Sequence, residues 1–138
     1  MNPSKEIADV MKNFYDRWSA GDSSFIDDLL TSQNDIVVVG TDPDEWWQQG
    51  RDTVRKIWST QFKEMGRVTI KPGRLSAYAD GDAGWAVDDP ALRMPDGTQA
   101  SLRFTCVFAR ESGDWRLVHA HASVGVPNED VIGQELTT

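Results

Sequence analysis

The two histidines of the chain, His119 and His121, stand two residues apart in the stretch LVHAHASV. Residues at this spacing project to the same side of a strand, so the two imidazoles would point the same way. Such a pair can bind a metal ion if a third ligand arrives from elsewhere, or it can make hydrogen bonds at a subunit interface. Because no third ligand is evident, we predict no metal site and favour the interface, with a general base or ligand contact in a pocket as the alternative.

Asp88 and Asp89 are neighbours, so in a strand they point to opposite faces and cannot work as a carboxylate pair. Trp85 and Val87 share the parity of Asp89. If these apolar residues face the core, Asp89 lies in low-dielectric surroundings that would raise its pKa. Asp89 is therefore the candidate general base. The alternative is a surface role in a turn, because Pro90 often marks a bulge that re-aims its neighbours.

Other polar stretches carry weaker signals. Asp42, Asp44 and Glu45 lack the spacing and glycine of a calcium loop, which favours a solvated turn before Trp46 and Trp47. Trp46 could lean over the mouth of a pocket. The sequence has no glycine-rich phosphate loop and no evident Ser-His-Asp arrangement.

The elements that position these residues fall into two halves. Apolar residues at spacings of three and four predict a helix that ends at Gly21, a second short helix capped by Asp22 or Ser23, and a third from about Asp52 to Gly66. From Arg67 onward, strand patterns alternate with compact turns, which predicts an antiparallel meander of four strands. We expect an α+β fold: a cone-shaped barrel with three N-terminal helices packed on a strongly curved, mainly antiparallel sheet.

The composition sets limits on the domain and its partners. With 138 residues, 39% of them hydrophobic, we expect a single domain over residues 1–126 and a polar tail over 127–138. A net charge of −8 argues against nucleic acid and anionic membranes as partners. The lone Cys106 resembles a small buried hydrophobe and allows no internal disulfide, and the N-terminus lacks an apolar signal segment. We therefore expect a cytoplasmic protein. We also expect no cofactor.

Three local motifs in this order of elements carry a resemblance. They are the Gly21-Asp22 break, the Gly50-Arg51-Asp52 start of a helix, and the closing stretch GDWRLVHAHAS from residue 113 to 123. Over residues 4–126 the chain resembles the nuclear transport factor 2-like superfamily, and within it SnoaL-like proteins and the association domain of calcium/calmodulin-dependent protein kinase. The resemblance implies a cone-shaped barrel, a dimer through the outer sheet face, and a pocket between the inner face and the helices.

The register of the closing hairpin decides which residues face that pocket. A three-residue loop with Gly113 in a bulge position is favoured; a two-residue Ser112-Gly113 loop would place Cys106 opposite His119. The favoured register predicts an apolar pocket floor made by Leu102, Phe104, Cys106, Phe108, Val118, Ala120 and Ala122. It places Leu117 and the interface candidates on the opposite face: Arg103, Trp115, His119 and His121.

Three functions remain open, since the superfamily contains isomerases, cyclases, dehydratases, epoxide hydrolases and members without catalysis. The first is a homodimeric small-molecule binding protein whose apolar or aromatic ligand contacts Tyr15, Trp46, Trp58, Trp85, Phe104 and Phe108. The second is an isomerase, cyclase or dehydratase of the ketosteroid isomerase type, with Asp89 moving a proton near a carbonyl. The third is a homo-oligomeric association module.

Overall fold

Helices dominate the first half of the chain and strands the second. The computed structural model describes residues 1–138, with helices α1 (Lys5–Ser19), α2 (Phe25–Leu29) and α3 (Arg51–Met65) ahead of the long strands. The short strands β1 (Asn2–Pro3), β2 (Val37–Val39) and β3 (Trp46–Trp47) precede or separate these helices. The remaining strands are β4 (Thr69–Lys71), β5 (Ser76–Asp80), β6 (Ala83–Asp88), β7 (Ala91–Arg93), β8 (Gln99–Ser101), β9 (Arg103–Glu111) and β10 (Asp114–Ser123).

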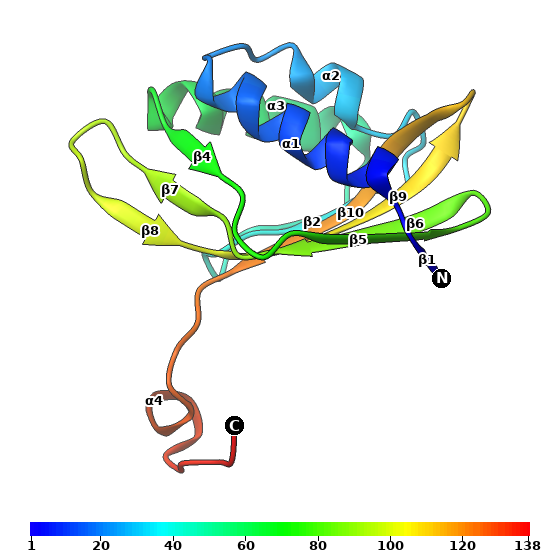
Figure 1. The fold of residues 1–138 in the computed structure, drawn as a ribbon. Helices are drawn as coiled ribbons and strands as arrows, with labels where there is room; N and C mark the ends of the chain where they lie inside the picture. The colour runs from blue at the N-terminus through cyan, green and yellow to red at the C-terminus, as the bar shows by residue number, and fades with distance from the viewer.

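The strands form two sheets. The main sheet has the order β1-β5-β6-β9-β10-β2-β3, with only the β10–β2 pair parallel, and the smaller sheet has the order β4-β7-β8. Helices α1, α2 and α3 lie over one face of the main sheet, and no helix covers its other face (Figure 1). We call these the inner and outer faces. The arrangement confirms the predicted α+β class with N-terminal helices on a curved sheet.

The curvature arises where predicted long strands break in two. Pro72 separates β4 from β5, and Pro90 separates β6 from β7, because proline cannot donate to a strand ladder. The backbone N–H of Leu102 donates to the carbonyl of Pro90 at 3.2 Å, where β8 gives way to β9. The outlying strands β4, β7 and β8 therefore turn away into their own sheet, and the predicted four-strand meander survives as β5, β6, β9 and β10.

The helices form where apolar spacing predicted them, and they bury the expected stripe. Ser4 caps α1 by accepting a hydrogen bond from the backbone N–H of Ile7. Helix α3 lies between Gly50 and Gly66, both of which have positive φ. The core between the helices and the inner face contains 22 buried residues, among them Phe14, Phe25, Phe108 and Leu117.

The β9–β10 hairpin begins in the register that the sequence analysis did not favour. Glu111 pairs with Asp114, so the loop is the two-residue Ser112-Gly113 turn rather than the favoured three-residue loop. The pairing then shifts between Leu117 and His119. Val118 is thus the extra residue of a β-bulge, and it flips the faces of the second half of the strand.

This bulge corrects the predicted faces of β10. Beyond it, Ala120 pairs with Cys106 and Ala122 with Phe104, as predicted for the inner face. Before it, Leu117 pairs with Phe108 and is completely buried, so Leu117 faces the helices and Val118 is not part of the pocket floor. The bulge also leaves the carbonyl of Leu117 to accept a hydrogen bond from the backbone N–H of Thr31 at 3.0 Å.

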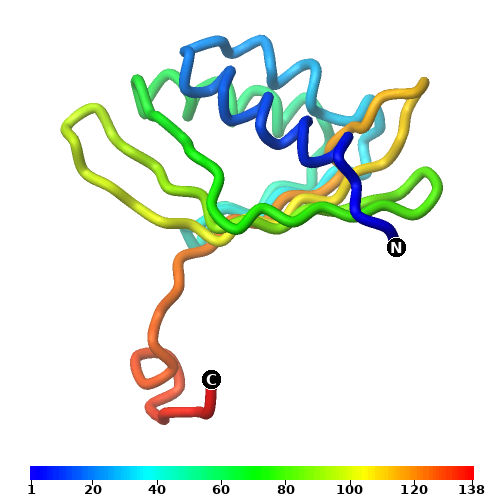
Figure 2. Tube along the Cα trace, viewed as in Figure 1, coloured from blue at the N-terminus to red at the C-terminus, as the bar shows by residue number.

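The chain after β10 leaves the body of the molecule. Residues from Val124 onward lead to a short helix, α4 (Asn128–Ile132), that buries none of its residues. The Cα trace carries this segment away from the outer side of the sheet (Figure 2). None of the helices has the length and apolar character required to cross a bilayer.

Candidate functional site

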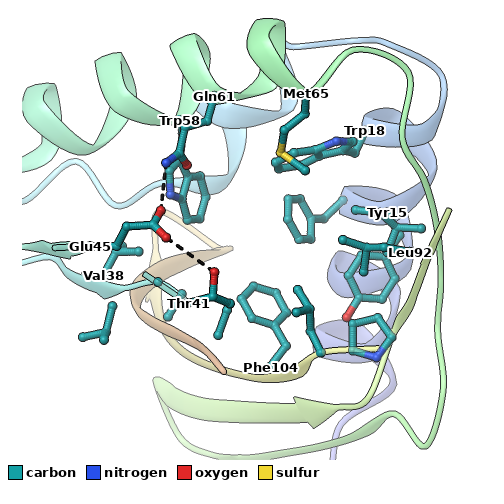
Figure 3. Close-up of a pocket in the computed structure, with 18 of the residues that line it drawn as sticks. Tyr15, Trp18, Val38, Thr41, Glu45, Trp58, Gln61, Met65, Leu92 and Phe104 are labelled. Atoms are coloured by element: carbon teal, nitrogen blue, oxygen red, sulfur yellow. Dashed lines mark hydrogen bonds between the residues drawn. The ribbon is translucent and has the colours of Figure 1, made fainter. Parts of the chain in front are cut away.

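A cavity of about 370 Å³ lies between the inner face of the sheet and helices α1 and α3 (Figure 3). Its volume falls within the range of small-molecule sites, roughly 300–1,000 Å³. Fourteen of its twenty lining residues are hydrophobic. The lining residues are Phe14, Tyr15, Trp18, Val38, Val39, Gly40, Thr41, Glu45, Trp47, Trp58, Gln61, Glu64, Met65, Ile70, Pro90, Leu92, Leu102, Phe104, Ala120 and Ala122.

Helical spacing and small floor residues create this space. Trp58, Gln61 and Met65 recur at intervals of three and four along α3, so they descend on one face of the helix into the cavity. On the sheet, the inner-face pair of Phe104 and Ala122 sets a large ring beside a methyl group. Alanine at the floor leaves the volume that a larger side chain would fill.

The walls are a connected set of aromatic rings. Phe14 stands at the centre, with ring centroids 6.4 Å from Trp58, 6.0 Å from Phe104 and 5.8 Å from Trp18. The Phe14 and Trp58 rings are stacked at 19°, and the Phe14 and Trp18 rings meet edge to face. Because each ring is held by its neighbours, these walls keep their shape without a ligand.

One end of the cavity is polar. The side-chain amide of Gln61 donates to Oε2 of Glu45 at 2.8 Å, and the backbone N–H of Asp42 donates to Oε1 at 2.8 Å. Thr41 lies within 3.5 Å of the same Oε1 (Figure 3). These contacts hold the Glu45 carboxylate at the cavity wall. Its partner Gln61 lies one turn of α3 after Trp58. Glu64 is the second carboxylate of the lining, at the exposed rim.

Tyr15 links α1 to the end of β6, where the chain enters the smaller sheet. Its hydroxyl donates to Oδ2 of Asp88 at 2.9 Å, and both residues are buried. Asp88 also accepts the backbone N–H groups of Gly73 and Asp89, at 3.0 and 2.9 Å. Burial, followed by the charge and hydrogen bond of Asp88, raises the pKa of the Tyr15 hydroxyl. Tyr15 is therefore a fixed, neutral wall residue.

Asp89 does not point into the cavity, which corrects the predicted orientation of β6. Gly84, Ala86 and Asp88 face the helices, whereas Trp85 and Val87 lie on the outer face. Asp89 instead accepts the backbone N–H of Arg74 at 2.6 Å and its guanidinium at 2.8 Å. These hydrogen bonds lower the pKa of the Asp89 carboxyl, opposite to the direction expected of a buried base. The prediction failed because Trp85 packs on Tyr78, with centroids 5.0 Å apart, on the outside of the sheet.

Three of the six predicted ligand contacts line the cavity: Tyr15, Trp58 and Phe104. Trp46 is 59% exposed and points away, and its neighbour Trp47 lines the cavity in its place. Trp85 belongs to the outer face, and Phe108 is buried in the core below the cavity without lining it.

The predicted interface residues divide between the two faces. His119 and His121 lie on the outer face, where Nδ1 of His119 is 2.8 Å from the carbonyl of Val37 and His121 is exposed. Arg103 is also exposed on this face. Trp115 is not, because the bulge turns it inward, where its indole N–H donates to Glu6 of α1 at 2.9 Å. No three His, Cys, Asp or Glu side chains lie close enough together to hold a metal ion.

The sequence interpretation missed the polar end of the cavity and the buried carboxylate. The sequence predicts a solvated turn at Glu45 and indicates no role for Gln61 or Glu64. A partial signal existed, since Gln61 and Glu64 follow Trp58 at helical intervals on the cavity side of α3. Nothing in the sequence joins Glu45 to that face, because the contact spans a loop and a helix.

Comparison with known proteins places this geometry in a family. The SnoaL-like domain family matches residues 7–127. No protein of curated function matches the chain. A similar solved structure is a nuclear transport factor 2-like protein of unknown function from Pseudomonas putida, with 19% identity over 95% of this chain and 91% of the other, at a TM-score of 0.78.

Two further structures share the fold. A proposed dehydratase of the same superfamily from Streptomyces avermitilis is 17% identical over 88% of this chain and 95% of the other, at a TM-score of 0.75. A proposed calcium/calmodulin-dependent protein kinase type II association domain from Thiobacillus denitrificans is 22% identical over 91% and 98%, at 0.70. These identities establish the common fold alone. Because the SnoaL-like domain family matches most of its length, the chain belongs to this family.

Proposed function

We propose that this protein binds a small, largely apolar molecule in the cavity between α1, α3 and the inner face of the sheet. The observation that carries the proposal is the cavity itself: about 370 Å³, with fourteen of twenty lining residues hydrophobic and a single polar end. Apolar walls provide affinity, and a few convergent polar groups fix the orientation of the ligand. Tyr15, Trp58 and Phe104 keep their proposed role as ligand contacts, and Trp47 replaces Trp46.

The test uses a neutral apolar fluorophore, N-phenyl-1-naphthylamine, whose emission rises in apolar surroundings. Ala122→Phe fills the floor of the cavity, and Ala83→Phe adds the same ring at an exposed position outside it. We expect the first variant to weaken binding at least about tenfold, the loss of roughly 1.4 kcal/mol. The second should bind as the parent does. Equal binding by both variants would reject the cavity as the site.

A catalytic role is the second candidate, and one contact favours it. Glu45 presents a carboxylate to the cavity and is held there by Gln61 and the backbone of Asp42. A positioned carboxylate can move a proton at a carbon next to a carbonyl, as an isomerase, cyclase or dehydratase requires. Glu45 thus takes the place that Asp89 had in the sequence interpretation. A screen of cyclic ketones and polyketide-like substrates with the parent and Glu45→Gln tests this role, and equal turnover would exclude Glu45 as the base.

Self-association is proposed through the outer face, which no helix covers. Trp85, Val107 and His119 are half-buried there, and Val87 and His121 are exposed. A second copy of this chain would cover these residues. Light scattering should give about twice the chain mass of 15.4 kDa, and Val87→Asp should shift the protein towards the monomer. Val131→Asp, in the exposed tail, is the matched control. The cytoplasmic location stays a prediction.

A further inference from the structure

The charges around the cavity have one sign. Glu45 and Glu64 are its only acidic lining residues, and the lining contains no lysine, arginine or histidine. Tyr15, the remaining ionisable residue on the wall, keeps its proton because burial raises its pKa. Neither glutamate forms a salt bridge with any residue of the chain. The cavity therefore presents negative charge that no protein cation neutralises.

The contacts of Glu45 supply only neutral donors. Oε2 accepts from the Gln61 amide, and Oε1 accepts from the backbone of Asp42, so the carboxylate is oriented without being neutralised. A neutral partner fixes the position of the charge and leaves its field directed at the cavity. An anionic ligand would have to approach this charge in apolar surroundings, which is unfavourable.

A tryptophan ring lies next to this charge. Figure 3 shows Trp58 beside the Glu45–Gln61 hydrogen bond, at the same end of the cavity. Six of the lining residues are aromatic: Phe14, Tyr15, Trp18, Trp47, Trp58 and Phe104. The faces of such rings attract organic cations, and tryptophan does so most strongly. A carboxylate and the Trp58 indole at one end, with an apolar remainder, match a cation carried on an apolar body.

We infer that the cavity selects an organic cation, a protonated amine or quaternary ammonium group on an apolar or aromatic body. The inference rests on the proposed binding function and specifies its ligand class. The cationic group lies at the Glu45 end, against Trp58. The apolar body extends past Phe104 towards Leu92, which lies across the cavity from Glu45 (Figure 3). The net charge of −8 adds a long-range attraction for cations.

Three probes of similar size test the inference. Benzyltrimethylammonium carries the cation, neopentylbenzene is its uncharged carbon isostere, and 4-tert-butylbenzoate is an anion. Binding to the full chain is followed by tryptophan fluorescence and calorimetry at low and high salt. We expect the cation to bind about tenfold more tightly than the isostere, and the anion to bind more weakly than both.

Glu45→Gln should reduce the preference for the cation several-fold and leave the affinity for the isostere unchanged. Asp44→Asn removes the same charge from the neighbouring exposed position outside the cavity, so it is the matched control and should keep the preference. If Glu45→Gln does not fold by circular dichroism, Glu64→Gln replaces it, with a smaller expected loss because Glu64 lies at the rim.

The outcomes separate this inference from the proposed function. Equal affinity for the cation and the isostere, or a preference for the anion, would overturn the cation inference, while binding of N-phenyl-1-naphthylamine would still support the binding function. Failure of every probe, that fluorophore included, would overturn both. Loss of the preference in Asp44→Asn as well would assign the effect to overall charge and overturn the role of Glu45.

Discussion

The hydroxyl of Tyr15 donates a 2.9 Å hydrogen bond to Asp88, a residue 73 positions away in the sequence. The bond joins α1 to the end of β6, just before Pro90 turns the chain into the smaller sheet. Asp88 is 3% exposed and accepts two further backbone hydrogen bonds, so its carboxylate is buried with three donors. This contact fixes the distance between the helix layer and the sheet that together enclose the cavity.

Breaking this contact should destabilise the fold. Tyr15→Phe removes one donor from a buried carboxylate, which costs about 1 to 3 kcal/mol in the free energy of unfolding. Asp88→Asn should cost a similar amount, and the double variant should cost less than the sum by about 1 kcal/mol. Urea denaturation of the four proteins measures this coupling, and strict additivity would show that the two side chains do not act together.

The buried acids Tyr15 and Cys106 should make the fold sensitive to alkali. Burial raises the pKa of both side chains above their ordinary values of 10.0 and 9.0. Above about pH 9 the unfolded chain releases these protons while the native chain keeps them, so the free energy of unfolding falls as the pH rises. Tyr15→Phe should flatten this fall above pH 10. Tyr78→Phe, which removes the tyrosine of the outer face, is the control and should retain the slope of the parent.

Asp89 should affect acid stability without affecting ligand binding. The hydrogen bonds from Arg74 lower its pKa below 3.8, so its contribution is present at neutral pH and is lost as the pH falls through the lowered value. Asp89→Asn should therefore flatten the acid end of the stability curve and leave the affinity for N-phenyl-1-naphthylamine unchanged. A large loss of affinity would return Asp89 to the site and contradict its position outside the cavity.

Removing the tail should leave the body intact. Helix α4 buries no residue, and Val131 and Ile132 are 67% and 58% exposed. Truncation after Val126 should change the free energy of unfolding by less than about 0.5 kcal/mol, as for other surface changes. Thermal denaturation measures this. A fall of several degrees in the melting temperature, or a change in the number of associated copies measured by light scattering, would mean that the tail packs on a neighbouring copy.

The helices and the fold class could be predicted because their signals are local. The apolar spacing of Ile7, Met11 and Phe14, and the glycines that end the helices, depend on neighbours in the sequence. The cavity floor at Ala120 and Ala122 was also predicted, although for the wrong reason. The favoured three-residue loop does not exist, and a bulge at Val118 instead returns Ala120 and Ala122 to the predicted face.

The site required information that no local pattern contains. The alternation of side chains along a strand correctly placed Asp88 and Asp89 on opposite faces. It cannot tell which of the two faces the helices cover. The apolar pair Trp85 and Val87 suggested the inner face, whereas Trp85 packs on Tyr78 across the outer one. Likewise, Glu45 and Gln61 meet only because the loop before β3 folds back against α3.

Deleting Val118 tests the bulge that sets both faces of β10. Without the extra residue, either Trp115 and Leu117 or Ala120 and Ala122 must turn to the outer face, because side chains alternate along a strand. Exposing Trp115 and Leu117 costs roughly 3 kcal/mol or more, and turning Ala120 and Ala122 outward would instead bring the polar rings of His119 and His121 to the apolar inner face. Either way, the deletion should lower the free energy of unfolding by about 3 kcal/mol. Deleting Val131 from the exposed tail is the control and should leave stability unchanged. If the Val118 deletion unfolds at the same urea concentration as the parent, the bulge is not required for the fold.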